Sequence, residues 1–343
     1  MNLTKTLLKN IDNKEIISYN VRFDNGFEVE ILNLGGIITK IITPDKNGNL
    51  ENIVVGYKDI ESYIQNSSYF GAIIGRTSGR ICEGKISIDG VDYDLAKNYN
   101  PHQGHGGDKG FNSKIWDVKI LEEENNVILK LYTKSLDMEE NYPGNLDLCV
   151  TFKIYEDYKI EQTYEAISDK TTLVNMTNHS YFNLSGNIKR PITDEYLKVD
   201  CDYILELDET CVPTGKKISV ENTPFDFTKE MLIGERIDDN NKQIQIGCGY
   251  DHAFILNGTK NQIKLNDIIS GRNMIIDTDQ DCVVIYSMNF PDDVELYNGN
   301  KTQRRYGICF ETQAAPIGRN MCFIEDSLLN KGEKYIQKTI YKF

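Results

Sequence analysis

Short apolar runs with alternating polar positions recur along most of the chain. Examples are Phe27–Leu34, Val127–Thr133, Leu148–Tyr155 and Tyr335–Tyr341, all rich in β-branched and aromatic residues. A period of two places successive side chains on opposite faces, as in a half-buried strand. These segments therefore predict strands with one face in a core.

Turn residues separate the runs. Asp89 and Gly90 stand between Lys85–Ile88 and Val91–Tyr93. This is a hairpin signal, because Asp-Gly suits a two-residue turn in which both central residues need positive φ.

Helical periodicity is confined to two short segments, Asp59–Gln65 and Thr228–Leu232. Many strands at hairpin spacing, with few helices between them, predict an all-β protein whose antiparallel sheets stack as a large sandwich. The chain contains no internal repeat and no linker rich in Pro, Gly or Ser. The simplest interpretation is one domain over residues 1–343.

Charge and cysteine usage restrict the class of partner and the compartment. Lys+Arg number 38 against 52 Asp+Glu, a net charge of -14, which argues against a nucleic-acid or anionic-membrane partner. Lys5 and Lys9 interrupt the first apolar residues, so no signal peptide is expected. The eight cysteines form no Cys-x-x-Cys pair. We therefore expect a cytoplasmic protein whose cysteines are buried free thiols.

The four histidines are the first candidates for chemistry. His102, His105, His179 and His252 all stand among Gly, Asn, Asp or Tyr rather than in apolar stripes. Loops and strand ends commonly build functional sites. We therefore expect the four to share a pocket.

Three standard sites do not fit the sequence. His102-x-x-His105 lacks a third ligand nearby, so no metal is expected. In Gly75–Gly79 the serine comes one place too late for a hydrolase elbow, and Gly104–Gly110 matches no phosphate loop. Acid–base chemistry from histidine and carboxylates remains. Glu311 ends an apolar strand and Asp251 lies between aromatic residues, but composition leaves open whether either carboxylate is only a surface residue.

Seven segments in order along the chain resemble motifs of the aldose 1-epimerases, or mutarotases. They are Gly71–Ile81 (GxxxGRxANRI), His105–Trp116 (HGG…GF…W), Tyr142–Phe152 (YPGNL…VTY), Asn178–Leu184 (NHSYFNL), Pro224–Phe227, Gly249–His252 and Phe310–Gln313 (FETQ). The resemblance implies a galactose mutarotase-like sandwich and an isomerase that interconverts the α- and β-anomers of free hexoses.

The resemblance also implies residue roles. His179 would be the general acid and Glu311 the general base. The positions at which the family contacts sugar hydroxyls correspond to Arg80, His105, Tyr181 and Asp251. Arg76 would support the structure rather than bind sugar, and Tyr181 and Phe182 could pack against the apolar face of the ring.

The chemistry suits such a pair of residues. An aldose ring is a hemiacetal, so exchanging anomers requires only proton transfers at O1 and at the ring oxygen, and no cofactor. Glutamate is ionised at neutral pH, and a neighbouring carboxylate would raise the pKa of His179 and keep it protonated. We expect a monomer or homodimer acting on a monosaccharide, with no nucleic-acid or membrane partner.

Some positions depart from the family pattern. Gly79 stands where many members have Asn, Val284 where Gln is frequent, and Pro316–Asn320 differs from PDAxN. These departures leave the preferred sugar open. Two alternatives also stay open: a hexose-6-phosphate 1-epimerase, which would need a cationic cluster such as Arg76 with Arg80, and a non-catalytic carbohydrate-binding module on the same fold.

Overall fold

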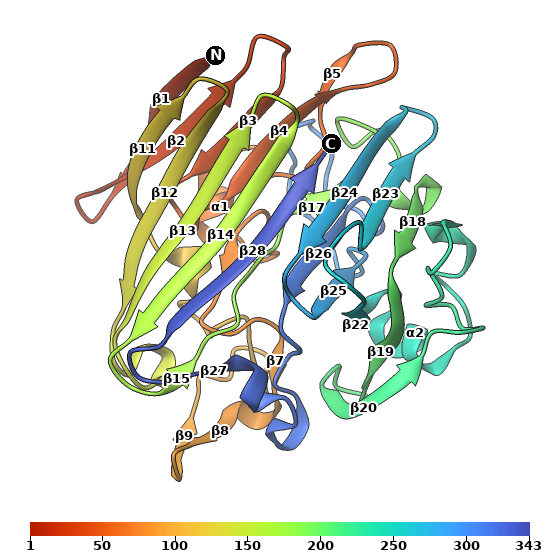
Figure 1. Ribbon diagram of the computed structural model, residues 1–343. Coiled ribbons are helices and arrows are strands. Elements are labelled where there is room, and N and C mark those ends of the chain that lie inside the picture. Colours follow the sequence, from red (N-terminus) through yellow and green to blue (C-terminus); the bar gives the residue numbers. More distant parts are fainter.

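Three antiparallel sheets make up most of the computed structural model, which describes residues 1–343 (Figure 1). The five-stranded sheet consists of β1 (Asn2–Ile11), β2 (Lys14–Arg22), β3 (Glu28–Leu32), β4 (Ile38–Pro44) and β5 (Leu50–Asn52). The nine-stranded sheet has the order β11 (Asp117–Glu123), β12 (Asn126–Ser135), β13 (Leu146–Tyr155), β14 (Lys159–Ser168), β28 (Lys334–Lys342), β24 (Arg272–Thr278), β23 (Ile263–Asp267), β18 (Tyr196–Val199) and β21 (Met231–Leu232). The six-stranded sheet has the order β17 (Tyr181–Phe182), β26 (Ile308–Gln313), β25 (Cys282–Tyr286), β22 (Asp251–Leu256), β19 (Cys201–Leu207) and β20 (Pro213–Ser219).

Short elements complete the fold. Four strand pairs are β6 (Ile73–Ile74) with β16 (Thr177–Asn178), β7 (Arg80–Ile81) with β10 (Gln103–Gly104), β8 (Lys85–Ile88) with β9 (Val91–Asp94), and β15 (Thr172–Leu173) with β27 (Leu328–Leu329). The α-helices are α1 (Ile60–Gln65) and α2 (Lys242–Gly247). No helix in the structure has the length and apolar character needed to cross a bilayer.

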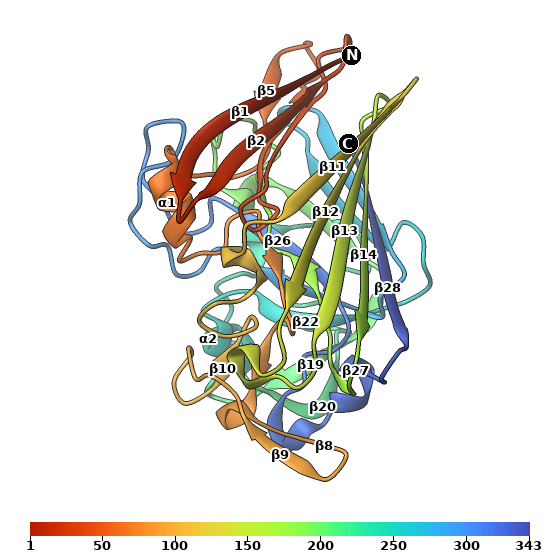
Figure 2. The ribbon, with the colours of Figure 1, turned by 90° about the vertical axis from the view of Figure 1, so that its left-hand side faces the viewer.

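The predicted sandwich is confirmed. In β13 the side chains alternate between buried and more exposed positions, so one face of the strand enters the core. One core cluster of 52 buried residues draws Val29, Val150 and Ile308 from the three sheets. Figure 2 shows β12, β13, β14 and β28 nearly edge-on, beside the layer that contains β1 and β2.

The hairpin and the first helix are also where the sequence predicts them. Asp89 and Gly90 have φ of 52° and 77° and join β8 to β9. Asp59 is the N-cap of α1, and its Oδ1 accepts a hydrogen bond from the backbone N–H of Ser62 at 2.9 Å.

The second predicted helix is wrong. Thr228 donates its hydroxyl to Asp226 in a local turn, and the chain then forms β21, which pairs with β18. Five residues would gain too few helical hydrogen bonds to offset nucleation, whereas the sheet edge satisfies the backbone directly. The cysteines are all free as expected, but only Cys201, Cys282 and Cys309 are buried.

Arg76 lies in the interior of the protein. It is 2% exposed. Its guanidinium donates hydrogen bonds to the carbonyls of Ser135, Leu136, Pro143 and Gly144 and to the hydroxyls of Ser135 and Thr172. This one side chain therefore holds the connection between β12 and β13 and ties it to β15.

We expect Arg76→Met to lower the free energy of unfolding by about 3 kcal/mol or more, because it leaves several buried carbonyls without a donor. Urea unfolding measures the change. Arg22→Met is the matched control: Arg22 is largely exposed, its nearest carboxylate oxygen on Glu28 is 3.9 Å away, and a loss of at most about 1 kcal/mol is expected. Equal effects of the two variants would contradict the role given to Arg76.

Candidate active site

A cavity of about 260 Å³ opens on one face of the six-stranded sheet. It brings together all six residues that the sequence predicts for the site: Arg80, His105, His179, Tyr181, Asp251 and Glu311. These residues come from segments far apart in the chain. The fold therefore assembles the group that the motifs only suggested.

Strand alternation positions the carboxylates. On β26, Ile308 and Phe310 belong to the core cluster, so Glu311 between Phe310 and Thr312 points to the opposite face, into the cavity. On β22, Phe254 packs in the core while Asp251 and Ala253 line the cavity. The same sheet thus supplies a packed face and a polar face.

His179 lies between β16 and β17, and backbone hydrogen bonds to a neighbouring segment hold it in place. Its N–H donates to the carbonyl of Ala72 at 2.9 Å, and its carbonyl accepts from the N–H of Gly71 at 3.0 Å. Its ring lies 5.1 Å from that of Tyr181, centroid to centroid. Paired backbone and ring contacts fix the imidazole before any ligand arrives.

The loop that carries His105 depends on close backbone contacts. Asn98 closes the loop: its side chain donates to the carbonyl of Gly104 and accepts from the N–H of that residue, both at 2.9 Å. Gly106 has φ of 85°, and a Cβ there would lie 1.9 Å from the carbonyl oxygen of Gly75. Only glycine fits this position, and the tight turn directs the His105 ring toward the cavity.

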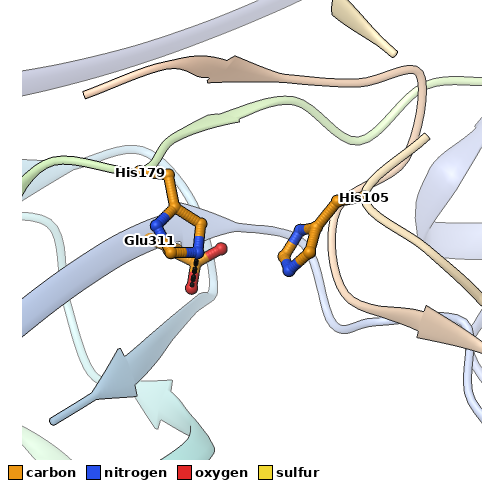
Figure 3. Close-up of side chains that lie close together, drawn as sticks. All are labelled: His105, His179 and Glu311. Carbon is orange, nitrogen blue, oxygen red and sulfur yellow. Dashed lines mark ion pairs between the residues drawn. The ribbon is translucent and has the colours of Figure 1, made fainter. Parts of the chain in front are cut away.

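His179 and Glu311 face each other at the bottom of the cavity (Figure 3). Nε2 of His179 lies 3.5 Å from Oε1 of Glu311, and the residues are 4% and 3% exposed. The other carboxylate oxygen, Oε2, is buried without a hydrogen-bond partner, as is Nδ1 of His105. The site therefore holds polar atoms that remain free to bind a ligand.

Burial controls the protonation of this pair. It raises the pKa of Glu311 well above 4.5, with a further contribution from the Asp251 carboxylate. It lowers the pKa of His179 to about 4. The expectation that a nearby carboxylate raises the pKa of His179 is wrong in its net direction, because loss of hydration on burial is the dominant effect.

Arg80 and Asp251 form a second polar pair in the cavity. Their closest N–O distance is 3.5 Å, and the guanidinium carbon of Arg80 lies 5.5 Å from the centroid of the Tyr99 ring. Burial raises the pKa of Asp251, and the Arg80 guanidinium opposes that shift. The pair offers donors and acceptors together, as recognition of hydroxyl groups requires.

Three expectations about the site are wrong. His252 and Phe182 point to the opposite face of the sheet, where their rings pack against Phe225 and Phe310. His102 is buried elsewhere, and its Nδ1 accepts from the N–H of Glu83 at 3.0 Å. Two of the four histidines therefore line the cavity, and the other two are structural.

The cavity also contains aromatic residues that the sequence patterns did not indicate. Tyr69, Tyr99, Tyr286 and Phe290 line it. Tyr286 could have been found, because a period of two on β25 places it on the same face as Val284. Tyr69 and Tyr99 lie in loops, where the sequence gives no such signal.

One cluster in the structure has the composition of a metal site. Ligand atoms of His105, His179 and Glu311 lie within 4.8 Å of one another. Two histidines and a carboxylate could bind a divalent cation. The spacing test on His102 and His105 could not detect this group, since its members come from three separate segments.

Known proteins match this chain over nearly its whole length. The family model described as aldose 1-epimerase matches residues 18–342. Human galactose mutarotase is 35% identical over 319 residues, which cover 92% of this chain and 90% of that protein. The aldose 1-epimerase of Streptococcus thermophilus is 30% identical, covering 97% of this chain and 95% of that protein. The structure of galactose 1-epimerase from Lactobacillus acidophilus superposes with a TM-score of 0.89 at 27% identity, covering 99% of this chain and 98% of that one.

Proposed function

Because the chain belongs to the aldose 1-epimerase family and is an isomerase that interconverts the anomers of aldoses, we propose that His179 and Glu311 carry out the proton transfers on free hexoses. The observation that supports this assignment is their geometry: a buried imidazole and carboxylate 3.5 Å apart in the cavity that contains the other polar candidates.

The proposed reaction begins with opening of the ring. Glu311 removes the proton from O1 while His179 donates a proton to the ring oxygen, and the bond between C1 and that oxygen breaks. The open aldehyde rotates about the C1–C2 bond. On reclosure the hydroxyl returns its proton to His179, Glu311 protonates the carbonyl oxygen, and the pair is restored with C1 inverted.

One shared proton is enough for this cycle. Burial favours the neutral pair, protonated Glu311 with neutral His179. Transfer of that proton across the 3.5 Å between them produces the base and the acid together. The pair is therefore ready for catalysis when it holds one proton in total.

This proton count predicts the pH dependence. Below about pH 4, where the pKa of His179 lies, the pair takes up a second proton and loses its base. Above the raised pKa of Glu311 it loses its only proton and therefore its acid. We expect a bell-shaped profile of kcat/KM with an acid limb near pH 4, measured by anomer exchange after subtraction of the spontaneous rate. An acid limb near pH 6.5, the ordinary pKa of histidine, would contradict the account.

The remaining polar groups would hold the sugar. We propose that Arg80, His105, Tyr181 and Asp251 bind ring hydroxyls, because all four line the cavity beside the catalytic pair. The cavity has one basic side chain with a permanent charge, Arg80, and it is paired with Asp251. A hexose 6-phosphate is therefore a poor fit, since a phosphate dianion needs more positive charge.

Polarimetry tests the activity. Fresh α-D-glucose or α-D-galactose should relax to its anomeric equilibrium faster with the protein than with a heat-inactivated sample. An unchanged relaxation rate for both sugars would refute the proposed substrate class. Strong competition by glucose 6-phosphate would favour the hexose-6-phosphate 1-epimerase. Binding of sugar in calorimetry without faster anomer exchange would favour a non-catalytic binding module.

A further inference from the structure

A row of side chains crosses the six-stranded sheet at the level of the proposed base. Val284 pairs with Glu311 on the neighbouring strand, and Ala253 pairs with Val284 on the strand after that. On the other side of Glu311, Tyr181 pairs with Cys309, and the same register places His179 opposite Glu311. Cross-strand neighbours on one face have Cβ atoms about 5 Å apart. His179 and Val284 therefore flank Glu311 on opposite sides.

This row orients the substrate, given the proposed function on which the inference rests. The anomeric carbon has two ring neighbours, the ring oxygen and C2. If Glu311 acts on O1 and His179 on the ring oxygen, C2 lies on the other side of the C1–O1 bond from His179. The substituent at C2 then faces β25 and β22, where Val284 and Ala253 line the cavity.

Beyond Glu311 the row itself is apolar. Val284 and Ala253 line the cavity there without a side-chain donor or acceptor, while the polar residues of the same two strands, Tyr286 and Asp251, pair with each other two residues further along. The closest polar group in the row is Glu311 itself, the proposed base for O1. Within this row a hydroxyl at C2 therefore meets only Glu311, which already acts on O1, and its removal leaves no other side chain of the row unpaired.

We infer that Val284 determines specificity at C2, and that this enzyme accepts aldoses lacking the C2 hydroxyl. A site built to hydrogen-bond a hydroxyl rejects the analogue without it, because its own buried polar group is left unpaired. Here the row beyond Glu311 is apolar, so the 2-deoxy sugar loses little. The chemical class of substrate is thus widened to 2-deoxyaldoses.

Position 284 is also a better place than position 79 to introduce a polar side chain that would restore selection for the C2 hydroxyl. Gly79, the other apolar departure beside the cavity, has φ of 73°, and a Cβ there would lie 2.6 Å from Cβ of Pro316. A side chain at Gly79 would displace Pro316 and strain the backbone. Val284 lies in a regular strand, where glutamine can be accommodated toward the cavity.

Exchange NMR at equilibrium tests the inference with D-glucose, 2-deoxy-D-glucose and, as a control at another carbon, 6-deoxy-D-glucose. For the wild type we expect kcat/KM for D-glucose to exceed that for 2-deoxy-D-glucose by less than about 100-fold. Val284→Gln should raise that ratio about tenfold or more, because its amide is unpaired without O2. It should leave the ratio of D-glucose to 6-deoxy-D-glucose unchanged. Val284→Leu, which adds bulk without an amide, should leave both ratios near those of the wild type.

The outcomes separate the two proposals. Discrimination above about 100-fold by the wild type, or an unchanged C2 ratio in Val284→Gln, would overturn the role of Val284 while the epimerase activity stands. A rise of the C6 ratio in place of the C2 ratio would overturn the proposed orientation of the sugar. Failure of the wild type to accelerate exchange of any of the sugars would refute the proposed function, and the inference with it.

Discussion

Glu311→Gln is expected to lower kcat for anomer exchange by about 10²–10⁴-fold, the usual contribution of a positioned general base. The amide has nearly the shape of the carboxylate but cannot take the proton from O1. It can still occupy the position 3.5 Å from Nε2 of His179 and donate or accept a hydrogen bond there. The loss should therefore appear mainly in kcat and only weakly in KM, as steady-state exchange kinetics can show.

Stability measurements separate this effect from misfolding. The pKa of Glu311 is raised above 4.5 in the folded protein, so its contribution to stability is fully present below about pH 4.5 and is lost as pH rises through the folded value. Glutamine does not ionise. As pH rises, the free energy of unfolding of the variant should therefore increase relative to that of the wild type. The variant should nevertheless remain less active than the wild type. Near-normal kcat in Glu311→Gln would remove Glu311 from the role of base.

His179→Asn should lower kcat by a similar factor, about 10²–10⁴-fold, because the ring oxygen of the sugar loses its proton donor. Nε2 of His179 is the atom that faces Glu311, while Nδ1 lies 3.5 Å from Sγ of Cys309 at the buried side. Asparagine can keep part of these contacts, but its amide does not deliver a proton. The acid limb of the pH profile near pH 4 should also disappear, since its origin is the protonation of His179.

His102→Asn is the matched control for this substitution. His102 is also buried, but it lies outside the cavity, and its Nδ1 accepts a backbone N–H that an asparagine oxygen can accept in its place. We expect kcat within about twofold of the wild type, because no group that touches the sugar changes. Equal losses in the His102 and His179 variants would mean that general damage, and not proton transfer, explains the result.

Local sequence patterns predicted strands well because burial alternates with the same period as the side chains. The alternation in Leu148–Tyr155 and the Asp-Gly turn at Asp89 each depend on only a few neighbouring residues. The order of strands in the sheets depends on distant contacts. Nothing in the β28 sequence indicates that it lies between β14 and β24, so the sequence predicted sandwich layers but no strand order.

In the site, too, the sequence predicted the local features but not those that depend on distant contacts. Motif resemblance identified His179 and Glu311, but only the fold shows that they face each other and are buried, which reverses the expected pKa shift of the histidine. His252 could have been excluded earlier: it follows Asp251 on a strand, so the two side chains must point to opposite faces. His102 lies in a loop, where neither polarity nor periodicity shows which way a ring points.

The most direct test of the central claim is a crystal structure of Glu311→Gln with D-galactose bound, since slow turnover preserves the sugar. The account predicts one pyranose ring in the cavity, with O1 within hydrogen-bond distance of the substituted side chain at position 311 and the ring oxygen within hydrogen-bond distance of Nε2 of His179. A sugar bound in another cavity, or bound here with C1 turned away from both side chains, would contradict it.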